Sequence, residues 1–238
     1  TLRVGGIVVP CNPQYVAREL KHQLSDSGAK VAVTLSLTYP ILKQIRAETS
    51  VEHAVVVNIK EYFPGLLKFL FTVAKEKKEG HFQDISGDAN TYWFQDLLAQ
   101  AQPEPVPVPS EPEETAVLMY TGGTTGVSKG AQLTHRNLVA NALQVRWWMA
   151  DSKEGQEVMM TALPLFHSYA MTVCMNHTIY LAGCMILIPN PRVLVHVLKS
   201  INKHKPSLFP GVPAMYVGVI NYPEVTKYDV SSIRACIS

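Results

Sequence analysis

Short apolar runs of strand length alternate with helix-length amphipathic segments along this 238-residue chain, and the alternation limits the folds open to it. In the first third the pattern predicts strands at 6–9, 30–35 and 53–58, with helices at 13–28 and 39–48. Helices that connect strands bring successive strands together in one direction. The sequence therefore predicts an α/β fold with doubly wound, mostly parallel sheets and flanking helices.

The alternation resumes in the second half of the chain. Strands are expected at 130–133, 157–163, 185–188 and 207–209, and helices after Thr134, at 167–181, at 192–203 and after Pro213. Between the two halves, five prolines within 103–112 are mixed with glutamates, which is typical of an extended connector. We expect a first βα part at 1–102 with an insertion at 60–90, a connector at 103–114, and a second βα part at 115–238.

Two segments combine apolar and basic residues. Residues 62–79 predict either a helix on a membrane surface, or a helix packed on its own domain or an insertion; the second interpretation is favoured because Glu61, Glu76 and Glu79 offset part of the positive charge. At 192–203 a basic stripe predicts a solvated helix face, with contact to an anionic partner as the alternative. The stripe comprises Arg192, His196, Lys199 and Lys203.

The composition limits the partners and the cellular location that we expect for this protein. A net charge of +2 with 17% charged residues does not indicate the strongly basic surface that binds nucleic acids. No apolar run approaches the roughly 18 residues of a membrane span, and no signal peptide is visible. The cysteines have no C-x-x-C spacing and lie in apolar surroundings, so we interpret them as buried thiols in a reducing cytoplasm. They are Cys11, Cys174, Cys184 and Cys236.

A stretch rich in glycine and threonine follows the apolar run 116–120 and predicts a phosphate-binding loop in a hairpin. Glycines let the backbone approach a ligand, and successive N–H groups can form a concavity for an anion. Hydroxyls add donors, and Lys129 adds a mobile positive charge. The stretch is Thr121, Gly122, Gly123, Thr124, Thr125, Gly126, Val127, Ser128, Lys129 and Gly130. It is not the G-x-x-x-x-G-K-[ST] loop, because Ser128 precedes the lysine and Gly130 follows it.

The stretch instead resembles the [ST]-G-G-T-T-G-x-[PS]-K-G signature of the adenylate-forming superfamily, and the chain is similar to long-chain acyl-CoA synthetases. Two further segments support the resemblance: Leu-Pro-Leu-Phe-His at 163–167 and Gly-Val-Pro-Ala-Met-Tyr at 211–216. The resemblance implies ATP-dependent activation of a long-chain fatty acid to acyl-AMP, then thioester formation with CoA. It also implies that the chain is part of the large N-terminal domain of such an enzyme.

The resemblance assigns roles to particular residues. The loop from Thr121 to Lys129 would hold the β- and γ-phosphates of ATP, and Thr121 would help to hold Mg²⁺. Lys129 and His167 would be the catalytic residues, with His167 near the acyl carboxylate and the passage to CoA. The acyl pocket would be lined by His167, Met171, Gly211, Val212 and Pro213.

The sequence leaves several alternatives open. A related enzyme could adenylate an aryl or amino acid, and a homologue could bind nucleotide or lipid without catalysis. The chain begins without methionine and stops inside the apolar run 233–237, so we expect it to be part of a longer protein and inactive alone. Peripheral membrane contact and homodimer formation are further hypotheses for the complete protein.

Overall fold

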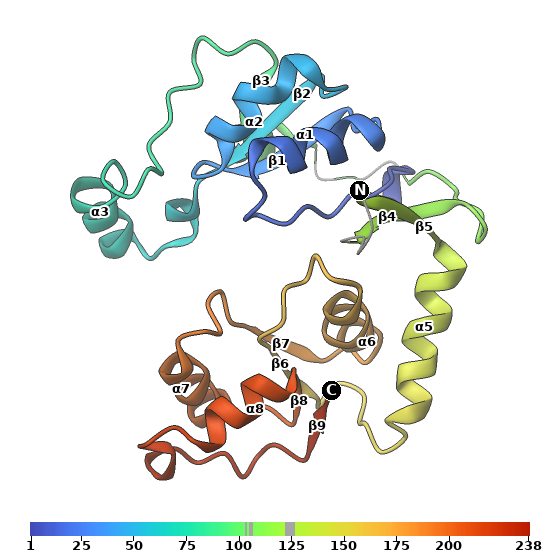
Figure 1. The fold of residues 1–238 in the computed structure, drawn as a ribbon, viewed down its shortest axis with the longest axis vertical. Coiled ribbons are helices and arrows are strands. Elements are labelled where there is room, and N and C mark those ends of the chain that lie inside the picture. The colour runs from blue at the N-terminus through green and yellow to red at the C-terminus, as the bar shows by residue number, and fades with distance from the viewer. Residues whose placement is uncertain (103, 105–106, 122–126) are drawn as a thin grey trace. The chain divides into compact units, whose positions relative to one another are not determined.

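The computed structural model describes residues 1–102, 104, 107–121 and 127–238. Its contacts divide the chain into two compact units. The first comprises Thr1–Ser110 with Tyr120–Ala131, and the second comprises Glu111–Met119 with Gln132–Ser238. Each unit contains a parallel sheet with helices beside it, which confirms the predicted α/β class (Figure 1). The sequence-based division at 102 and 115 stays a prediction.

The sheet of the first unit has three parallel strands in the order β1-β2-β3. They are β1 (Val31–Leu35), β2 (His53–Val57) and β3 (Thr91–Trp93), and the helices of this unit are α1 (Ala17–Asp26), α2 (Tyr39–Ile45), α3 (Gly65–Ala74) and α4 (Phe94–Gln100). Val31 pairs with His53, and Ala54 pairs with Thr91. The register makes β2 the central strand, and its three middle residues are buried.

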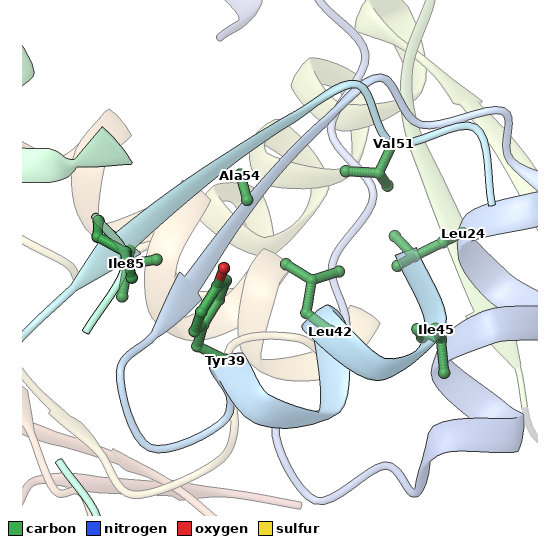
Figure 2. Close-up of a cluster of buried hydrophobic side chains, with 8 residues drawn as sticks. Leu24, Tyr39, Leu42, Ile45, Val51, Ala54 and Ile85 are labelled. Atoms are coloured by element: carbon green, nitrogen blue, oxygen red, sulfur yellow. The ribbon is translucent and has the colours of Figure 1, made fainter. Parts of the chain in front are cut away.

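The core of this unit lies between the sheet and the first two helices. Tyr39 and Leu42 rise from α2 toward Ala54 of β2, and Leu24 of α1 closes the cluster (Figure 2). The Tyr39 hydroxyl donates to Asp88 Oδ2 at 2.6 Å, which satisfies the one polar atom that this side chain brings into the core.

Two expectations for the first unit are wrong. The helix predicted from residue 13 begins at Ala17, because Asn12 forms a turn: its Oδ1 accepts from Gln14 N at 2.9 Å. The helix start is instead fixed by Glu19, whose carboxylate accepts the Val16 N–H at 3.1 Å. Residues 6–9 form no strand, since only an isolated bridge occurs there, at Val8. Strand β3 and helix α4 were not expected from the sequence.

The hairpin that carries the predicted loop is confirmed. Strands β4 (Thr115–Thr121) and β5 (Lys129–Thr134) pair in a two-stranded sheet. The seven-residue connection is too short for a parallel crossover, so the pair is antiparallel. Thr134 then caps α5 (His135–Trp148) as expected: its hydroxyl accepts the Asn137 N–H at 3.2 Å, and Asn137 Oδ1 accepts the Thr134 N–H at 3.0 Å.

The sheet of the second unit has four parallel strands in the order β7-β6-β8-β9. They are β6 (Val158–Thr161), β7 (Cys184–Leu187), β8 (Leu208–Pro210) and β9 (Ala235–Ile237), and the helices after α5 are α6 (His177–Tyr180), α7 (Leu194–His204) and α8 (Pro213–Ile220). The predicted helix at 167–181 contains a π-helical segment, Ala170–Asn176, directly before α6. Buried residues of β6, α7 and β8 form the centre of the core.

One buried carboxylate joins the amino ends of three strands in this sheet. Glu157 precedes β6 and is only 4% exposed. Its Oε2 accepts from the Ser207 hydroxyl just before β8, and its Oε1 accepts from Arg234 Nη2 at 2.8 Å just before β9. The Lys153 N–H also donates to Oε1 at 2.8 Å. Glu157, Ser207 and Arg234 are called the Glu157 node below.

Two surface expectations for the second unit are corrected. Helix α7 begins at Leu194, so Arg192 of the predicted basic stripe precedes the helix, while His196, Lys199 and Lys203 are exposed on it. Cys184 and Cys236 are exposed rather than buried, and Cys11 is half-buried. Cys236 alternates with partly buried neighbours on β9, and Cys184 begins the edge strand β7. Cys174 is buried, and burial raises the pKa of its thiol to about 11.

Candidate functional site

The ends of the predicted phosphate loop lie on β4 and β5 in the first unit. Thr121 ends β4 and Lys129 begins β5, and both are exposed. Ser128 closes the base of the loop, since its hydroxyl donates to the Thr121 carbonyl at 2.7 Å. Among the residues that the structure describes, Lys129 makes no ion pair, so its ammonium group is available to a ligand. Gly122, Gly123, Thr124, Thr125 and Gly126 lie outside the described residues.

Helix α1 contacts both ends of this loop. The Tyr120 hydroxyl donates to Asp26 Oδ2 at 2.6 Å, one residue before the loop begins. His22 Nε2 lies 2.8 Å from the Ser128 carbonyl oxygen and donates to it, one residue before Lys129. Burial and the Asp26 carboxylate both raise the pKa of Tyr120, so the phenol keeps its proton. We call His22 and Asp26 the α1 contacts of the loop.

Gly130 lets the Tyr120 ring approach the returning strand closely. A methyl group at Gly130 would lie 2.9 Å from the Tyr120 ring carbons Cε2 and Cζ, closer than real side-chain contacts. A larger residue would push the ring away from its position, and with it the hydroxyl that reaches Asp26. This close approach gives a structural reason for glycine after Lys129.

Beside this loop, the described residues offer a divalent cation the exposed hydroxyl of Thr121. In the part of the chain that the structure describes, no three His, Cys, Asp or Glu side chains form a metal-binding group. Mg²⁺ commonly keeps one or two protein ligands and takes the rest from water and substrate phosphates. The single exposed hydroxyl of Thr121 fits such a cation, held chiefly by a nucleotide.

In the second unit, the other predicted segments follow neighbouring parallel strands. Residues 163–167 follow the carboxyl end of β6, and Gly211 and Val212 follow the carboxyl end of β8. These two strands are adjacent in the sheet. Ligands of open α/β sheets bind at the carboxyl ends of the strands, so the topology places both segments at the edge where a substrate is expected.

One carbonyl oxygen connects the two segments. The Tyr169 and Tyr216 hydroxyls each donate to the Ile237 carbonyl oxygen at 2.7 Å, and the Gly211 N–H donates to it at 2.9 Å. Tyr216 also reaches the Phe209 carbonyl at 2.8 Å. Its ring lies so close to Gly211 that a methyl group there would be 2.9 Å from Cζ.

The individual side chains of this edge differ in exposure. His167 is exposed, and its ring lies 4.7 Å from the Phe166 ring, centroid to centroid. Met171 is buried on the π-helical segment, and its N–H donates to the His167 carbonyl at 2.9 Å. Val212 and Pro213 are exposed at the start of α8. An exposed imidazole and two exposed apolar side chains therefore lie at this edge, whereas the Met171 side chain is buried.

Sequence reasoning missed three residues that shape these segments: His22, Asp26 and Tyr169. His22 lies 106 positions before Ser128, and Asp26 lies 94 positions before Tyr120. Neither stands in a recognisable motif, so no local signal could have linked α1 to the loop. Tyr169 lies two residues after the predicted motif, and its hydroxyl was the only available signal.

Known proteins resemble this chain over nearly its whole length. The long-chain-fatty-acid–CoA ligase of Bacillus subtilis (strain 168) is 41% identical over 239 residues, covering 100% of this chain and 42% of that protein. Among solved structures, the anthranilate CoA ligase AuaEII in complex with anthranoyl-AMP has a TM-score of 0.79 at 22% identity, covering 98% of this chain and 40% of the other. A long-chain-fatty-acid-CoA ligase (FadD1) from Archaeoglobus fulgidus has a TM-score of 0.71 at 27% identity, covering 96% and 39%.

The chain thus spans less than half the length of these proteins. A family model described as AMP-binding enzyme matches residues 1–238, the whole chain. The Gly/Thr-rich hairpin with its lysine and the parallel sheets are accordingly parts of a member of the AMP-binding enzyme family.

Proposed function

We propose that the complete protein containing this chain is a long-chain fatty acid–CoA ligase, which uses ATP and Mg²⁺ to activate the fatty acid. The observation that carries the proposal is the 41% identity, over all of this chain, to a long-chain-fatty-acid–CoA ligase. The exposed Lys129 beside a hairpin loop of glycines and threonines supports the nucleotide part of the proposal.

The reaction has two balanced steps. A carboxylate oxygen of the fatty acid attacks the α-phosphorus of ATP, forming the acyl-phosphate bond of acyl-AMP while pyrophosphate leaves. The CoA thiol, losing its proton, then attacks the acyl carbonyl carbon, and AMP leaves as the thioester forms. Lys129 would bind the β- and γ-phosphates and stabilise the charge that develops as pyrophosphate departs. Mg²⁺, held in part by Thr121, would neutralise the phosphate oxygens when bound.

The remaining residues position the substrates in this proposal. The backbone of the loop from Gly122 to Gly126 would donate to phosphate oxygens. His167 would lie near the acyl carboxylate and the passage to CoA, and Met171, Gly211, Val212 and Pro213 would line the acyl pocket. Methionine is unbranched and adapts to irregular apolar shapes, which suits a long chain.

A second candidate is activation of an aryl acid. The observation in its favour is the TM-score of 0.79 to the anthranilate CoA ligase. That protein is only 22% identical to this chain, against 41% for the fatty-acid enzyme. An amino-acid-activating enzyme and a non-catalytic homologue have no comparable support.

A carboxylate panel tests the proposal on the complete protein. ATP–pyrophosphate exchange is measured with palmitate, anthranilate and an amino acid as the added carboxylate. The proposal expects exchange with palmitate well above the other two. Exchange with anthranilate alone would establish the second candidate, and no exchange with any acid would contradict the ligase proposal.

We expect the α1 contacts to tune nucleotide binding. In the complete protein, His22→Ala removes the donor to Ser128 and should raise the KM for ATP by roughly three- to tenfold with a smaller change in kcat, since one such bond contributes about 1 kcal/mol. His22→Gln keeps an N–H donor and should recover part of the loss. Ser25→Ala on the same helix is the control, because Ser25 contacts Glu48 rather than the loop. An equal rise in KM for Ser25→Ala would contradict a local role.

Peripheral membrane contact and homodimer formation are proposals for the complete protein. None of the helices in the described part of the chain combines the length and apolar character that crossing a bilayer requires. A cytoplasmic location stays a prediction.

A further inference from the structure

Helix α3 turns its apolar stripe outward, away from the unit that carries it. Leu66, Phe69, Leu70 and Val73 recur at i, i+3, i+4 and i+7, and their exposed fractions are 75%, 64%, 52% and 72%. Such a stripe normally faces the core. Here Phe71 is the only buried residue of the helix. The expectation that this helix packs on its own domain therefore does not hold for its main apolar face.

Contacts at the other side of the helix set this orientation. The Phe71 ring meets the Phe63 ring edge to face at 5.2 Å and the His81 ring at 5.5 Å. Two residues past the helix, Glu76 is buried, and its carboxylate binds Lys60 at 2.6 Å and the Asn58 amide at 2.7 Å. The helix is thus anchored by one aromatic residue and one buried ion pair, and its apolar stripe takes no part in the anchoring.

The charge around α3 is positive at one end. Residues 60–79 contain five lysines and three glutamates. All three glutamates are engaged, in the pairs Glu61–Lys68, Glu76–Lys60 and Glu79–Lys75. Within the described part of the chain, Lys77 and Lys78 form no ion pair and are exposed just beyond the helix. The two remaining charges complement an anionic surface next to the apolar stripe.

We propose that α3 docks the protein on an anionic lipid surface, with the stripe of Leu66, Phe69, Leu70 and Val73 inserted among the lipid chains and with Lys77 and Lys78 at the headgroups. A helix of ten residues is about 15 Å long and lies in the plane of the interface rather than crossing the bilayer. In Figure 1, α3 stands on the excursion that leaves β2 and returns to β3, which makes it a projecting part of its unit.

The composition of the stripe favours lipid over a protein partner. Protein interfaces are depleted in lysine, and leucine and valine are under-represented among their dominant residues. Leucine and phenylalanine beside lysine are instead typical of interfacial helices. The inference rests on these contacts and charges, and it does not depend on the ligase activity.

Vesicle sedimentation of the complete protein without ATP tests the proposal. Vesicles of phosphatidylcholine with phosphatidylglycerol should bind the protein, and vesicles of phosphatidylcholine alone should bind it more weakly. Phe69→Ser with Leu70→Ser should weaken binding on the order of tenfold or more, since it removes two apolar side chains from the inserted face. Lys77→Gln with Lys78→Gln should remove most of the preference for the anionic vesicles.

Thr72→Ala is the matched control, because Thr72 donates to the Lys68 carbonyl on the same helix and lies off the stripe. It should bind like the unaltered protein. The proposal would be overturned if the unaltered protein did not bind vesicles, or if the Phe69/Leu70 variant bound them equally well. It would also be overturned if that variant changed its sedimentation coefficient without lipid, because the stripe would then contact a second copy of the protein. Since none of these measurements uses ATP or a fatty acid, failure here is distinct from failure of the ligase proposal.

Discussion

Replacing Lys129 by alanine in the complete protein is expected to slow formation of the acyl-adenylate by on the order of a hundredfold or more. At an effective dielectric constant of about 20, a lysine ammonium 4 Å from a phosphate oxygen contributes roughly 4 kcal/mol before desolvation. Alanine removes this charge and leaves the hairpin intact, because Lys129 is exposed and its side chain holds no described neighbour in place. The measurement is palmitate-dependent ATP–pyrophosphate exchange at saturating fatty acid.

Two further variants test whether the effect is specific to the charge at position 129. Lys199→Ala removes another exposed lysine, on α7, and should leave exchange unchanged. Lys129→Arg keeps a positive charge but replaces a compact ammonium with a planar fork, so it should recover only part of the rate. Exchange by Lys129→Ala at the unaltered rate would refute the role of this lysine in the proposed reaction.

Replacing Arg234 by methionine should lower the free energy of unfolding by about 3 kcal/mol, because it leaves the buried Glu157 carboxylate without its cation. Ser207 and the Lys153 N–H still donate to Glu157, but neither carries a charge. Breaking a buried ion pair costs about 3 to 5 kcal/mol of stability. The low end of this range applies because the Arg234 side chain is 32% exposed. Urea denaturation of the complete protein at pH 7 measures the loss.

A second substitution isolates the buried charge as the cause. Adding Glu157→Gln to Arg234→Met removes the unpaired carboxylate and should recover most of the stability. Lys205→Met is the control for an exposed pair: it breaks the contact with Asp229 and should cost at most about 1 kcal/mol. If the double variant were no more stable than Arg234→Met, lost packing rather than charge would explain the effect.

The Glu157 node also predicts a dependence on pH. Burial alone would raise the pKa of Glu157, but donation from Ser207, the Lys153 N–H and Arg234 outweighs burial, so the pKa lies below its ordinary value of 4.5. The unfolded chain therefore takes up a proton at a higher pH than the folded chain does. The contribution of Glu157 is present above pH 4.5 and is lost as the pH falls through the folded pKa. The stability difference between the unaltered protein and Glu157→Gln should shrink over this range.

The sequence predicted the elements that obey a strong local rule. Residues adjacent in the chain are enough to predict the alternation of strands and helices, the Thr134 cap and the hairpin around the Gly/Thr-rich loop. The start of α1 was misplaced because Asn12 and Pro13 suit both a turn and a helix start, and the carboxylate of Glu19 decided between them. Strand β3 has three residues, too few to produce a recognisable period.

The candidate site could be predicted only where its residues lie together in the chain. The loop ends and the segments at 163–167 and 211–216 each form a short motif. The contact of His22 with Ser128 depends on how α1 packs in the first unit, and no pattern in either stretch encodes it. The outward orientation of α3 was likewise hidden, because a periodic apolar stripe looks the same whether it faces a core or a lipid surface.

The Glu157 node and the candidate acyl segments occupy opposite ends of strands that are only three or four residues long. The amino ends hold the sheet together through one carboxylate, while the carboxyl ends present His167, Gly211 and Val212. Mutations that remodel one edge need not disturb the other. For the proposed ligase, a lineage could therefore change the acid that it accepts by exchanging side chains at the carboxyl edge, while the sheet that supports them is inherited intact.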